Sequence, residues 1–303
     1  MNFYKVMKSI FFSKISTPEN NGLAEQTFSL INSILIAKQQ NKKVIILDSF
    51  KSDNIPIPSC EVFDLEKLNN FLKEHDILIV DKSCIDYKIN AVFYNQDNKV
   101  VDITDKVKKV ISPPQNVSEI FINYTINDKT ISDTYPRMNL TTDIQLYTYN
   151  QVEANIQKDK LFDSILTNID FKPYLKKNMH FDNIIHLNEE YEKYAGVNIE
   201  EYKYKLDQTY IHIIEEFMNK QESVLLIGKS ENQMVNDFLK EKDYNYEVDI
   251  LTDSFKEIEL LHYSCNTFVG NFDLENLKGN TYSYYLSKKL KCKKKIMIDL
   301  YNL

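Results

Sequence analysis

Small and hydroxyl-bearing residues cluster near the end of the chain, in an order suited to binding an anion. Gly270 ends a short apolar run, and Gly279, Asn280, Thr281 and Ser283 open an expected helix. The first N–H groups of a helix lack intrahelical partners, and the helix dipole attracts negative charge to them. The same residue types are also good helix caps. The stretch therefore predicts either a phosphate-binding turn or an ordinary capped helix.

Two further polar positions follow apolar runs. The loop 17–22 ends at Gly22 and precedes a helical pattern over 23–40, and His186 and Asn188 close the run that starts at residue 183. In open α/β sheets, ligands bind at the carboxyl ends of the strands. The sequence therefore predicts a cleft between the Gly22 loop, the end of strand 183–187 and the helix that follows Gly279.

The pattern of elements that position these residues predicts a doubly wound α/β protein. Short apolar runs, which are typical of strands buried on both faces, alternate with helical patterns in the C-terminal half. Strands are expected at 183–187, 223–227, 246–251, 267–269 and 295–299, and helices at 198–219, 231–242, 254–263 and from 280. This alternation predicts a parallel sheet.

The N-terminal half begins with the same pattern and then becomes harder to interpret. It predicts strands at 4–13, 43–48 and 76–80, a helix near 64–74, and short strands around 91–95, 119–124 and 144–148. Residues 151–180 are polar and lysine-rich with one helical pattern. We therefore expect two Rossmann-like domains facing a cleft: an N-terminal α/β domain over 1–155, a hinge over 156–180 and a C-terminal domain over 181–303.

Composition excludes several classes of protein. The 303 residues include 43% hydrophobic and 27% charged side chains, as in a globular protein, and the net charge of −7 argues against a nucleic-acid binder. Arg137, expected in a loop, is the only arginine, so the charge run Lys291–Lys295 and the other lysines carry the positive charge. We interpret that run as a solvated surface and not as a phosphate site.

Cysteine and histidine spacing predicts no metal site. The four cysteines lie far apart, which favours reduced thiols and an intracellular protein, and the five histidines lack ligand spacing. No segment has the roughly 20 apolar residues of a membrane span, and no secretory signal is recognised. We expect a soluble, cytoplasmic protein, or one in the host cytoplasm or virion if the chain is viral.

Three stretches together resemble the GDP-fucose fucosyltransferase superfamily. Residues 21–28 are similar to its G-x-G-N-Q loop, residues 184–188 occupy the place of its H-x-R strand end, and residues 265–283 resemble its C-x-x-F-I-G and S-x-F-S segment. The likeness covers most of the chain and looks closest to fucosyltransferase-like proteins of giant DNA viruses. It implies a GT-B fold and inverting transfer from GDP-fucose, without a metal or other cofactor.

The resemblance also implies roles for individual residues. Donor binding would fall to residues of the loop, the strand end and the C-terminal segment: Gly22, Gln26, His186, Glu259, Gly270, Thr281 and Ser283. Glu259 would meet the base or ribose, and the last three would hold the diphosphate.

Two departures from the family pattern concern charge. Asn188 stands where the family has an arginine that neutralises the diphosphate, and Glu25 stands in the donor loop. Losing one donor that stabilises developing charge costs about 100-fold or more in rate. Glu25 is either a base for the acceptor hydroxyl or a solvent-facing residue of the first helical turn.

The sequence therefore predicts a fucosyltransferase-like protein with impaired or altered transfer of a nucleotide sugar to a glycan or protein acceptor. The alternative is a catalytically degenerate GT-B fold that binds a partner, for example as a virion or host-interaction protein. No nucleic-acid partner is expected.

Overall fold

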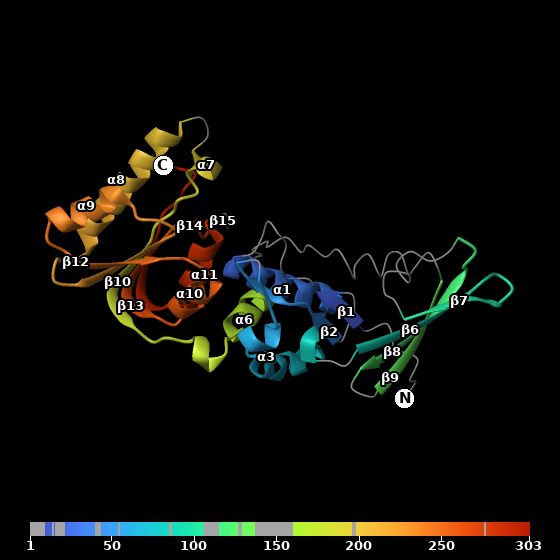
Figure 1. Cartoon of the computed structure of the whole chain (residues 1–303). Helices are drawn as coiled ribbons and strands as arrows, with labels where there is room; N and C mark the ends of the chain where they lie inside the picture. Colours follow the sequence, from blue (N-terminus) through green and yellow to red (C-terminus); the bar gives the residue numbers. More distant parts are fainter. Residues whose placement is uncertain are drawn as a thin grey trace. The chain divides into compact units, whose positions relative to one another are not determined.

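The chain divides into two compact units, each described by itself (Figure 1). A computed structural model describes residues 10–13, 15, 22–39, 44–53, 55–84, 87–105, 115–126, 129–136, 160–195, 198–275 and 277–303. The N-terminal unit comprises Met1–Asn21 and Glu25–Lys172, and the C-terminal unit comprises Gly22–Ala24 and Pro173–Leu303. The boundary between Lys172 and Pro173 falls inside the stretch expected to be a hinge.

A small parallel sheet forms one part of the N-terminal unit. Its strands, in the order β1-β2-β5, are β1 (Ile10–Ser13), β2 (Val44–Leu47) and β5 (Leu78–Asp81). Helix α1 (Leu23–Gln39) connects β1 to β2, and α3 (Leu65–Leu72) precedes β5. The predicted strand–helix–strand unit is thus confirmed for residues 10–47, while residues 4–9 of the expected first strand lie outside the described residues.

Short elements fill the connections of this unit. They are β3 (Phe50–Ser52), β4 (Ile55–Ile57), α2 (Ser59–Val62), η2 (Lys73–His75) and η3 (Lys82–Cys84). Strands β3 and β4 form an antiparallel pair.

A four-stranded antiparallel sheet is the main difference from the expected N-terminal domain. Its strands, in the order β7-β6-β8-β9, are β6 (Tyr87–Tyr94), β7 (Val100–Thr104), β8 (Glu119–Ile126) and β9 (Lys129–Pro136). The sequence predicted only parts of β6 and β8. Strand β9 is rich in polar residues, and Asp102 interrupts the short apolar run of β7, so neither has the continuous apolar run that revealed the parallel strands. The strand expected at 144–148 lies outside the described part of the chain.

Helix α6 (Lys160–Asn168) ends the N-terminal unit and packs into its core. The ring of Phe162 lies 5.6 Å from that of Phe28 on α1, measured between centroids. The ring centroid of Phe171, which follows the helix, lies 5.5 Å from that of Phe63. Much of the polar stretch expected as a hinge is therefore an ordered helix with a buried apolar side.

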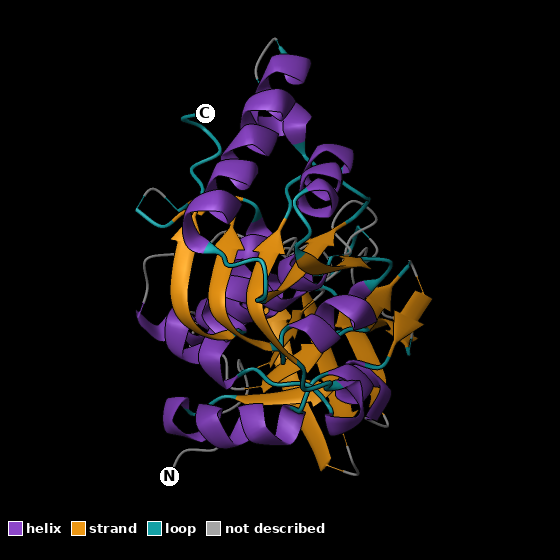
Figure 2. Cartoon of the chain, turned by 90° about the vertical axis from the view of Figure 1, so that its left-hand side faces the viewer, coloured by secondary structure: helices purple, strands orange, loops and turns teal. Residues whose placement is uncertain are grey.

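The C-terminal unit is built on a five-stranded parallel sheet, as predicted. Its strands are β10 (His180–His186), β11 (Ser223–Gly228), β12 (Asn245–Ile250), β13 (Ser264–Gly270) and β16 (Lys291–Met297). Their order is β12-β11-β10-β13-β16, with every neighbouring pair parallel. Read in chain order this is 3-2-1-4-5, the order of the Rossmann fold. Figure 2 shows these strands as a twisted fan.

Helices cover both faces of this sheet (Figure 1). They are α7 (Tyr191–Tyr194), α8 (Ile199–Phe217), α9 (Gln233–Glu241), α10 (Ser254–Leu260) and α11 (Thr281–Lys289), with η4 (Pro173–Leu175) before the first strand. Leu206 and Ile214 of α8 and Leu239 of α9 pack with Ile185 and Leu226 of the strands. Fully burying such a side chain contributes about 1.5–3 kcal/mol, so this layer is a main source of the unit's stability.

The alternation of strand side chains sends neighbouring residues to opposite faces. In β10, Ile185 packs toward α8 and α9, whereas His186 contacts α11. The polar residue at the strand end is thereby directed to the face that carries α11.

The last strand of this unit begins earlier than predicted. The sequence predicted a strand at 295–299 after a solvated charge run, whereas Lys291–Lys295 already belong to β16. All four lysines of the run are exposed, as predicted. A strand at the edge of a sheet keeps one side in solvent, so lysines are tolerated there. Within the described residues, no helix is long and apolar enough to span a membrane.

Candidate functional site

The candidate site lies where the strand order of the C-terminal sheet reverses. β10 and β13 are neighbours, with Ile185 paired to Val269, and the chain leaves them for opposite faces of the sheet. Such a switch point is the usual ligand site of doubly wound folds. Here it brings the end of β10 next to Asn271, which directly follows β13.

His186, Asn271 and Ser283 form the inner part of the site. His186 Nδ1 lies 2.5 Å from Ser283 Oγ, and either atom can be the donor. The Asn271 N–H donates to the same hydroxyl at 2.9 Å, and the Asn271 side-chain amide donates to the backbone carbonyl of His186. All three side chains are buried. The predicted residues His186 and Ser283 are thus in direct contact, and Asn271, which the sequence did not single out, bonds to both.

Tyr210 of α8 links this group to Asn188. Its hydroxyl accepts from the Asn188 N–H at 2.8 Å and donates to Asn271 Oδ1 at 2.6 Å. The Tyr210 side chain extends from the helix to the strand ends, and its hydroxyl thus bonds to polar groups on both sides of the switch point. The sequence placed Tyr210 in the apolar stripe of its helix, which is correct for the ring but gives no sign of the hydroxyl's role.

Asn280 and Asn188 meet at the start of α11. The Asn280 side chain accepts from the Ser283 N–H at 3.0 Å and so caps the helix. Its Nδ2 lies 3.3 Å from Asn188 Oδ1. The Asn188 amide nitrogen is unusual, because Asn188 is fully buried and its Nδ2 donor has no hydrogen-bond partner among the described residues. A buried donor without a partner costs about 1–3 kcal/mol, which makes this atom the main polar irregularity of the site.

Gly279 sets the path by which the chain enters α11. Residues Phe272–Asp273 (β14) and Lys278–Gly279 (β15) form a short antiparallel pair. Gly279 has φ +131°, and a Cβ there would lie 2.7 Å from the Asn271 carbonyl oxygen. Only glycine adopts this conformation in such a space. The glycine therefore allows Asn280 to donate its N–H to Asn271 O at 2.8 Å.

The site is electrically neutral. Burial, with a smaller contribution from the Lys229 ammonium, lowers the pKa of His186 to about 3, so the imidazole is uncharged at neutral pH. Burial also raises the pKa of Tyr210 and of Tyr282, whose ring packs edge-on against His186 at 5.4 Å. The inner residues therefore offer hydrogen bonds without net charge.

Charges at the rim of the site are largely offset. Lys229 Nζ lies 3.6 Å from Glu190 Oε1. Glu189 accepts the Ser230 N–H at 2.7 Å, beside the close approach of the chain at Gly228. Because the ammonium nearest His186 already faces a carboxylate, it is poorly placed to neutralise a diphosphate as well.

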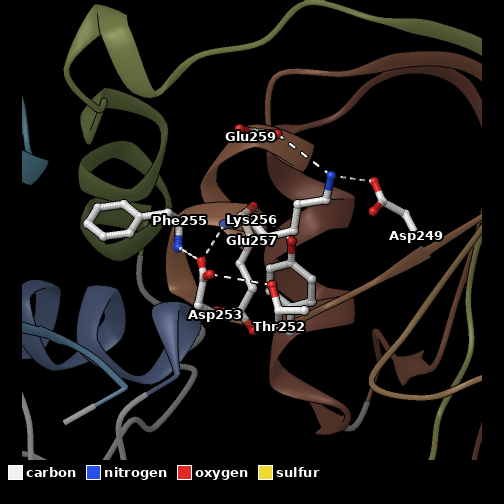
Figure 3. A network of polar contacts seen from close by, with 8 residues as sticks. Asp249, Thr252, Asp253, Phe255, Lys256, Glu257 and Glu259 are labelled. Carbon is white, nitrogen blue, oxygen red and sulfur yellow. Dashed lines mark hydrogen bonds and ion pairs between the residues drawn. The ribbon is translucent and has the colours of Figure 1, made fainter. Parts of the chain in front are cut away.

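Glu259, expected at the base or ribose, is held in a separate network (Figure 3). Lys256 Nζ lies 3.0 Å from Asp249 and 3.7 Å from Glu259. Asp253 caps α10 by accepting the N–H groups of Phe255 and Lys256 at 2.8 and 2.9 Å. A different α10 residue, Glu257, contacts α11: its backbone carbonyl accepts from the Tyr282 hydroxyl at 2.8 Å.

Most of the predicted residues of the N-terminal half belong to α1 or directly precede it. Gln26 is buried on α1, and its amide donates to Lys51 O at 2.7 Å and accepts from Lys51 N at 2.8 Å, which anchors β3. Glu25, half-buried, lies in the first turn of α1. Gly22 directly precedes that helix, and Arg137 lies outside the described residues.

Gly270 and Thr281 frame the switch point. Gly270 is the last residue of β13, and its carbonyl accepts from the Ile298 N–H at 2.8 Å. Thr281 is half-buried at the first position of α11. The structure thus brings together His186, Asn188 and Ser283, with these two residues beside them.

The chemistry available to this arrangement is hydrogen bonding. Neutral amide, hydroxyl and imidazole groups meet the N-terminus of a nine-residue helix, where a polar or anionic group is favoured. Across the described ranges, no group of three His, Cys, Asp or Glu side chains is arranged to hold a metal ion. Comparisons with protein-family models, curated proteins and solved structures found no match to this chain.

Proposed function

We propose that this protein is a fucosyltransferase-like member of the GT-B class whose transfer of the sugar from GDP-fucose is impaired. The proposal includes the two-domain GT-B arrangement, a cytoplasmic location and a donor site that works without a metal or other cofactor. The observation that carries it is the Asn188 amide nitrogen, a buried donor without a partner in the described part of the chain, beside the N-terminus of α11 at the switch point.

Two features support nucleotide binding at this place. The strand order of the C-terminal sheet is that of nucleotide-binding folds, and ligands of such folds contact the switch point. A phosphate oxygen at the start of α11 would be favoured by the helix dipole and would give the Asn188 donor an acceptor. The sequence resemblance to donor-site segments rests on the same residues.

The charges of the site support impairment. His186 is neutral, Asn188 replaces the arginine that the resemblance implies, and Lys229 faces Glu190. A leaving diphosphate gains little stabilisation from neutral donors when an ammonium nearby is already paired. The second candidate function is a GT-B fold that binds a glycan or protein without catalysis, and the neutral interior of the site is what favours it.

Calorimetric titration of the whole chain with GDP and GDP-fucose tests the proposal, together with an assay for fucose release. We expect binding of both ligands with little or no release. Binding with rapid hydrolysis or transfer would show that donor chemistry is intact. No binding of any nucleotide or nucleotide sugar would overturn the proposal and leave the second candidate.

The variant Asn188→Leu identifies the binding site. It removes the unpaired donor and also the acceptor of Asn280 Nδ2 with little change in volume, so the two effects on thermal stability oppose each other and the net change should be small. GDP affinity should fall about five- to tenfold, equivalent to roughly 1–1.4 kcal/mol. Asn236→Leu on α9 is the matched control, because Asn236 Oδ1 is also buried without a partner. Equal losses of affinity in the two variants would argue against the switch point.

A further inference from the structure

The last sheet strand and the helix before it form a basic surface on an acidic protein. Residues 276–298 contain seven lysines and no aspartate or glutamate, whereas the whole chain has a net charge of −7. Four of these lysines lie on β16 (Lys291, Lys293, Lys294 and Lys295), and Lys288 and Lys289 end α11. Such a concentration of one sign of charge attracts a partner of the other sign.

In the part of the chain that the structure describes, two of the four lysines on β16 interact with neighbouring helices, and two do not. Lys295 donates to Ser287 O on α11, and Lys294 lies 3.8 Å above the ring of Phe217 at the end of α8. Because side chains alternate along a strand, Lys291 and Lys293 share the α11 side with Lys295. Both are exposed, and neither forms a hydrogen bond, ion pair or ring contact within the described residues. They are therefore charges that the unit itself does not use.

The backbone of β16 is also incompletely paired. The strand has one neighbour among the described strands, β13, with Cys265 aligned to Cys292 and Gly270 to Met297. An edge strand presents a row of N–H and C=O groups that can pair with another extended segment. Lysines on an edge normally discourage such pairing, and here they would repel a second copy of the same strand. They do not repel an acidic strand.

We propose that β16, with the lysines at the end of α11, docks an acidic extended segment of a partner protein by strand addition. The partner's backbone would extend the sheet beyond β16, and its carboxylates would face Lys291 and Lys293. This surface is separate from the switch point, because the lysines lie at the beginning of β16 and Gly270 lies beside its end. The inference does not depend on the proposed function.

An acidic peptide fits this surface better than a nucleic acid does. Phosphate recognition favours the planar fork of arginine, and the positive charge here is entirely lysine. Strand addition combines main-chain hydrogen bonds with side chains at alternate positions. That spacing matches Lys291 and Lys293.

Fluorescence anisotropy with the whole chain tests the inference. The probe is a labelled peptide in which Glu and Thr alternate, compared with the same peptide carrying N-methyl groups at alternate backbone positions. We expect binding that weakens with salt and a loss of about tenfold or more on N-methylation. Equal binding of the two peptides would overturn strand addition, because charge alone would then explain the affinity.

Charge reversal locates the surface. Lys291→Glu with Lys293→Glu should weaken peptide binding about tenfold or more, whereas Lys240→Glu with Lys242→Glu, at the exposed end of α9, should change it less than twofold. Circular dichroism checks that both variants fold. Equal effects of the two pairs, or tighter binding of a single-stranded RNA or of phosphatidylserine vesicles than of the acidic peptide, would overturn the inference.

Discussion

His186 stabilises the fold as a neutral side chain, because its imidazole shares the Ser283 hydroxyl in the buried layer between β10 and α11. Protonation would place a charge there without a carboxylate to receive it. The residue is therefore better suited to positioning and hydrogen bonding than to proton transfer near neutral pH. That distinction separates a binding site from one that performs acid–base chemistry.

The depressed pKa of His186 predicts a stability that depends on pH. An unfolded histidine binds a proton below about pH 6.5, but His186 in the fold does so only near pH 3. The unfolded state thus binds more protons in this window, and stability falls as pH decreases. Between pH 6.5 and 5.0 the loss in the free energy of unfolding is about 1.6 kcal/mol, which urea unfolding at each pH measures.

His186→Gln is the control for this effect, because glutamine keeps a polar group without the titration. The variant should be less stable at pH 7 and should lose little further stability by pH 5.0. Asp207, whose pKa burial raises, acts in the opposite direction but is present in both proteins. A variant with the same dependence on pH as the parent would contradict the assignment to His186.

At the scale of elements, the turn before α11 depends on one backbone conformation. Gly279→Ala would place a Cβ at φ +131°, 2.7 Å from a backbone carbonyl oxygen. Because backbone cannot easily move aside, we expect a loss of roughly 2 kcal/mol or more in the free energy of unfolding. Urea titration measures it.

Gly270→Ala provides the comparison for that variant. A Cβ at Gly270 would meet side-chain atoms of Phe268 and Met297 at 2.8 and 3.0 Å, which can shift. We expect the smaller loss of the two. If Gly279→Ala were the milder substitution, the proposed backbone constraint would be wrong.

The pairing of β13 with β16 brings two cysteines together. Cys265 and Cys292 are register partners, and the hydrogen bond from the Cys265 thiol lowers the pKa of Cys292 to about 7, aided by the Lys295 ammonium. Thiolates are the reactive form. Iodoacetamide should therefore modify Cys292 at a rate that rises as the pH increases through 7. Mass spectrometry of the proteolytic peptides measures this rate.

Removing the donor should reverse this activation. In Cys265→Ala the midpoint for Cys292 should move up toward the usual cysteine value near 8.5. Cys60, half-buried in the other unit, serves as an internal reference for reagent access. An unchanged midpoint would mean that the Cys265 thiol does not set the reactivity of Cys292.

The elements most visible in the sequence are those whose burial is continuous. Strands of the C-terminal sheet were predicted because runs such as residues 223–227 are apolar on both faces. Their first residues were missed where they are polar, as at His180 and Lys291. The antiparallel strands were missed because Asp102 interrupts the apolar residues of β7 and polar residues predominate in β9.

The candidate site was predictable only in part. His186 and Ser283 stood out because of their types and positions, and the structure places them in contact. Gln26 stood out as well, yet its amide is used by the Lys51 backbone, a pairing set by tertiary structure. Tyr210 and Asn271 were not expected because a tyrosine in an apolar stripe and an asparagine after a strand have many ordinary roles.

At the scale of the whole molecule, the boundary after Lys172 separates two hydrophobic cores. The five strands of the C-terminal sheet and the helices on both of its faces all come from residues 173–303. A buried hydrophobic cluster of this unit is likewise formed within that range. A unit of this size with its own core is expected to fold alone.

Expression of residues 173–303 as a fragment tests this expectation. The fragment should unfold in one cooperative transition, show the amide-exchange protection of β10, β11 and β13, and retain any GDP or acidic-peptide binding of the whole chain. Its cooperativity follows from a sheet whose central strands are covered on both faces by its own helices. A fragment starting after β10, at residue 187, is the control, because it loses the central strand and should not fold. Failure of the 173–303 fragment to fold would mean that its core depends on residues of the N-terminal half.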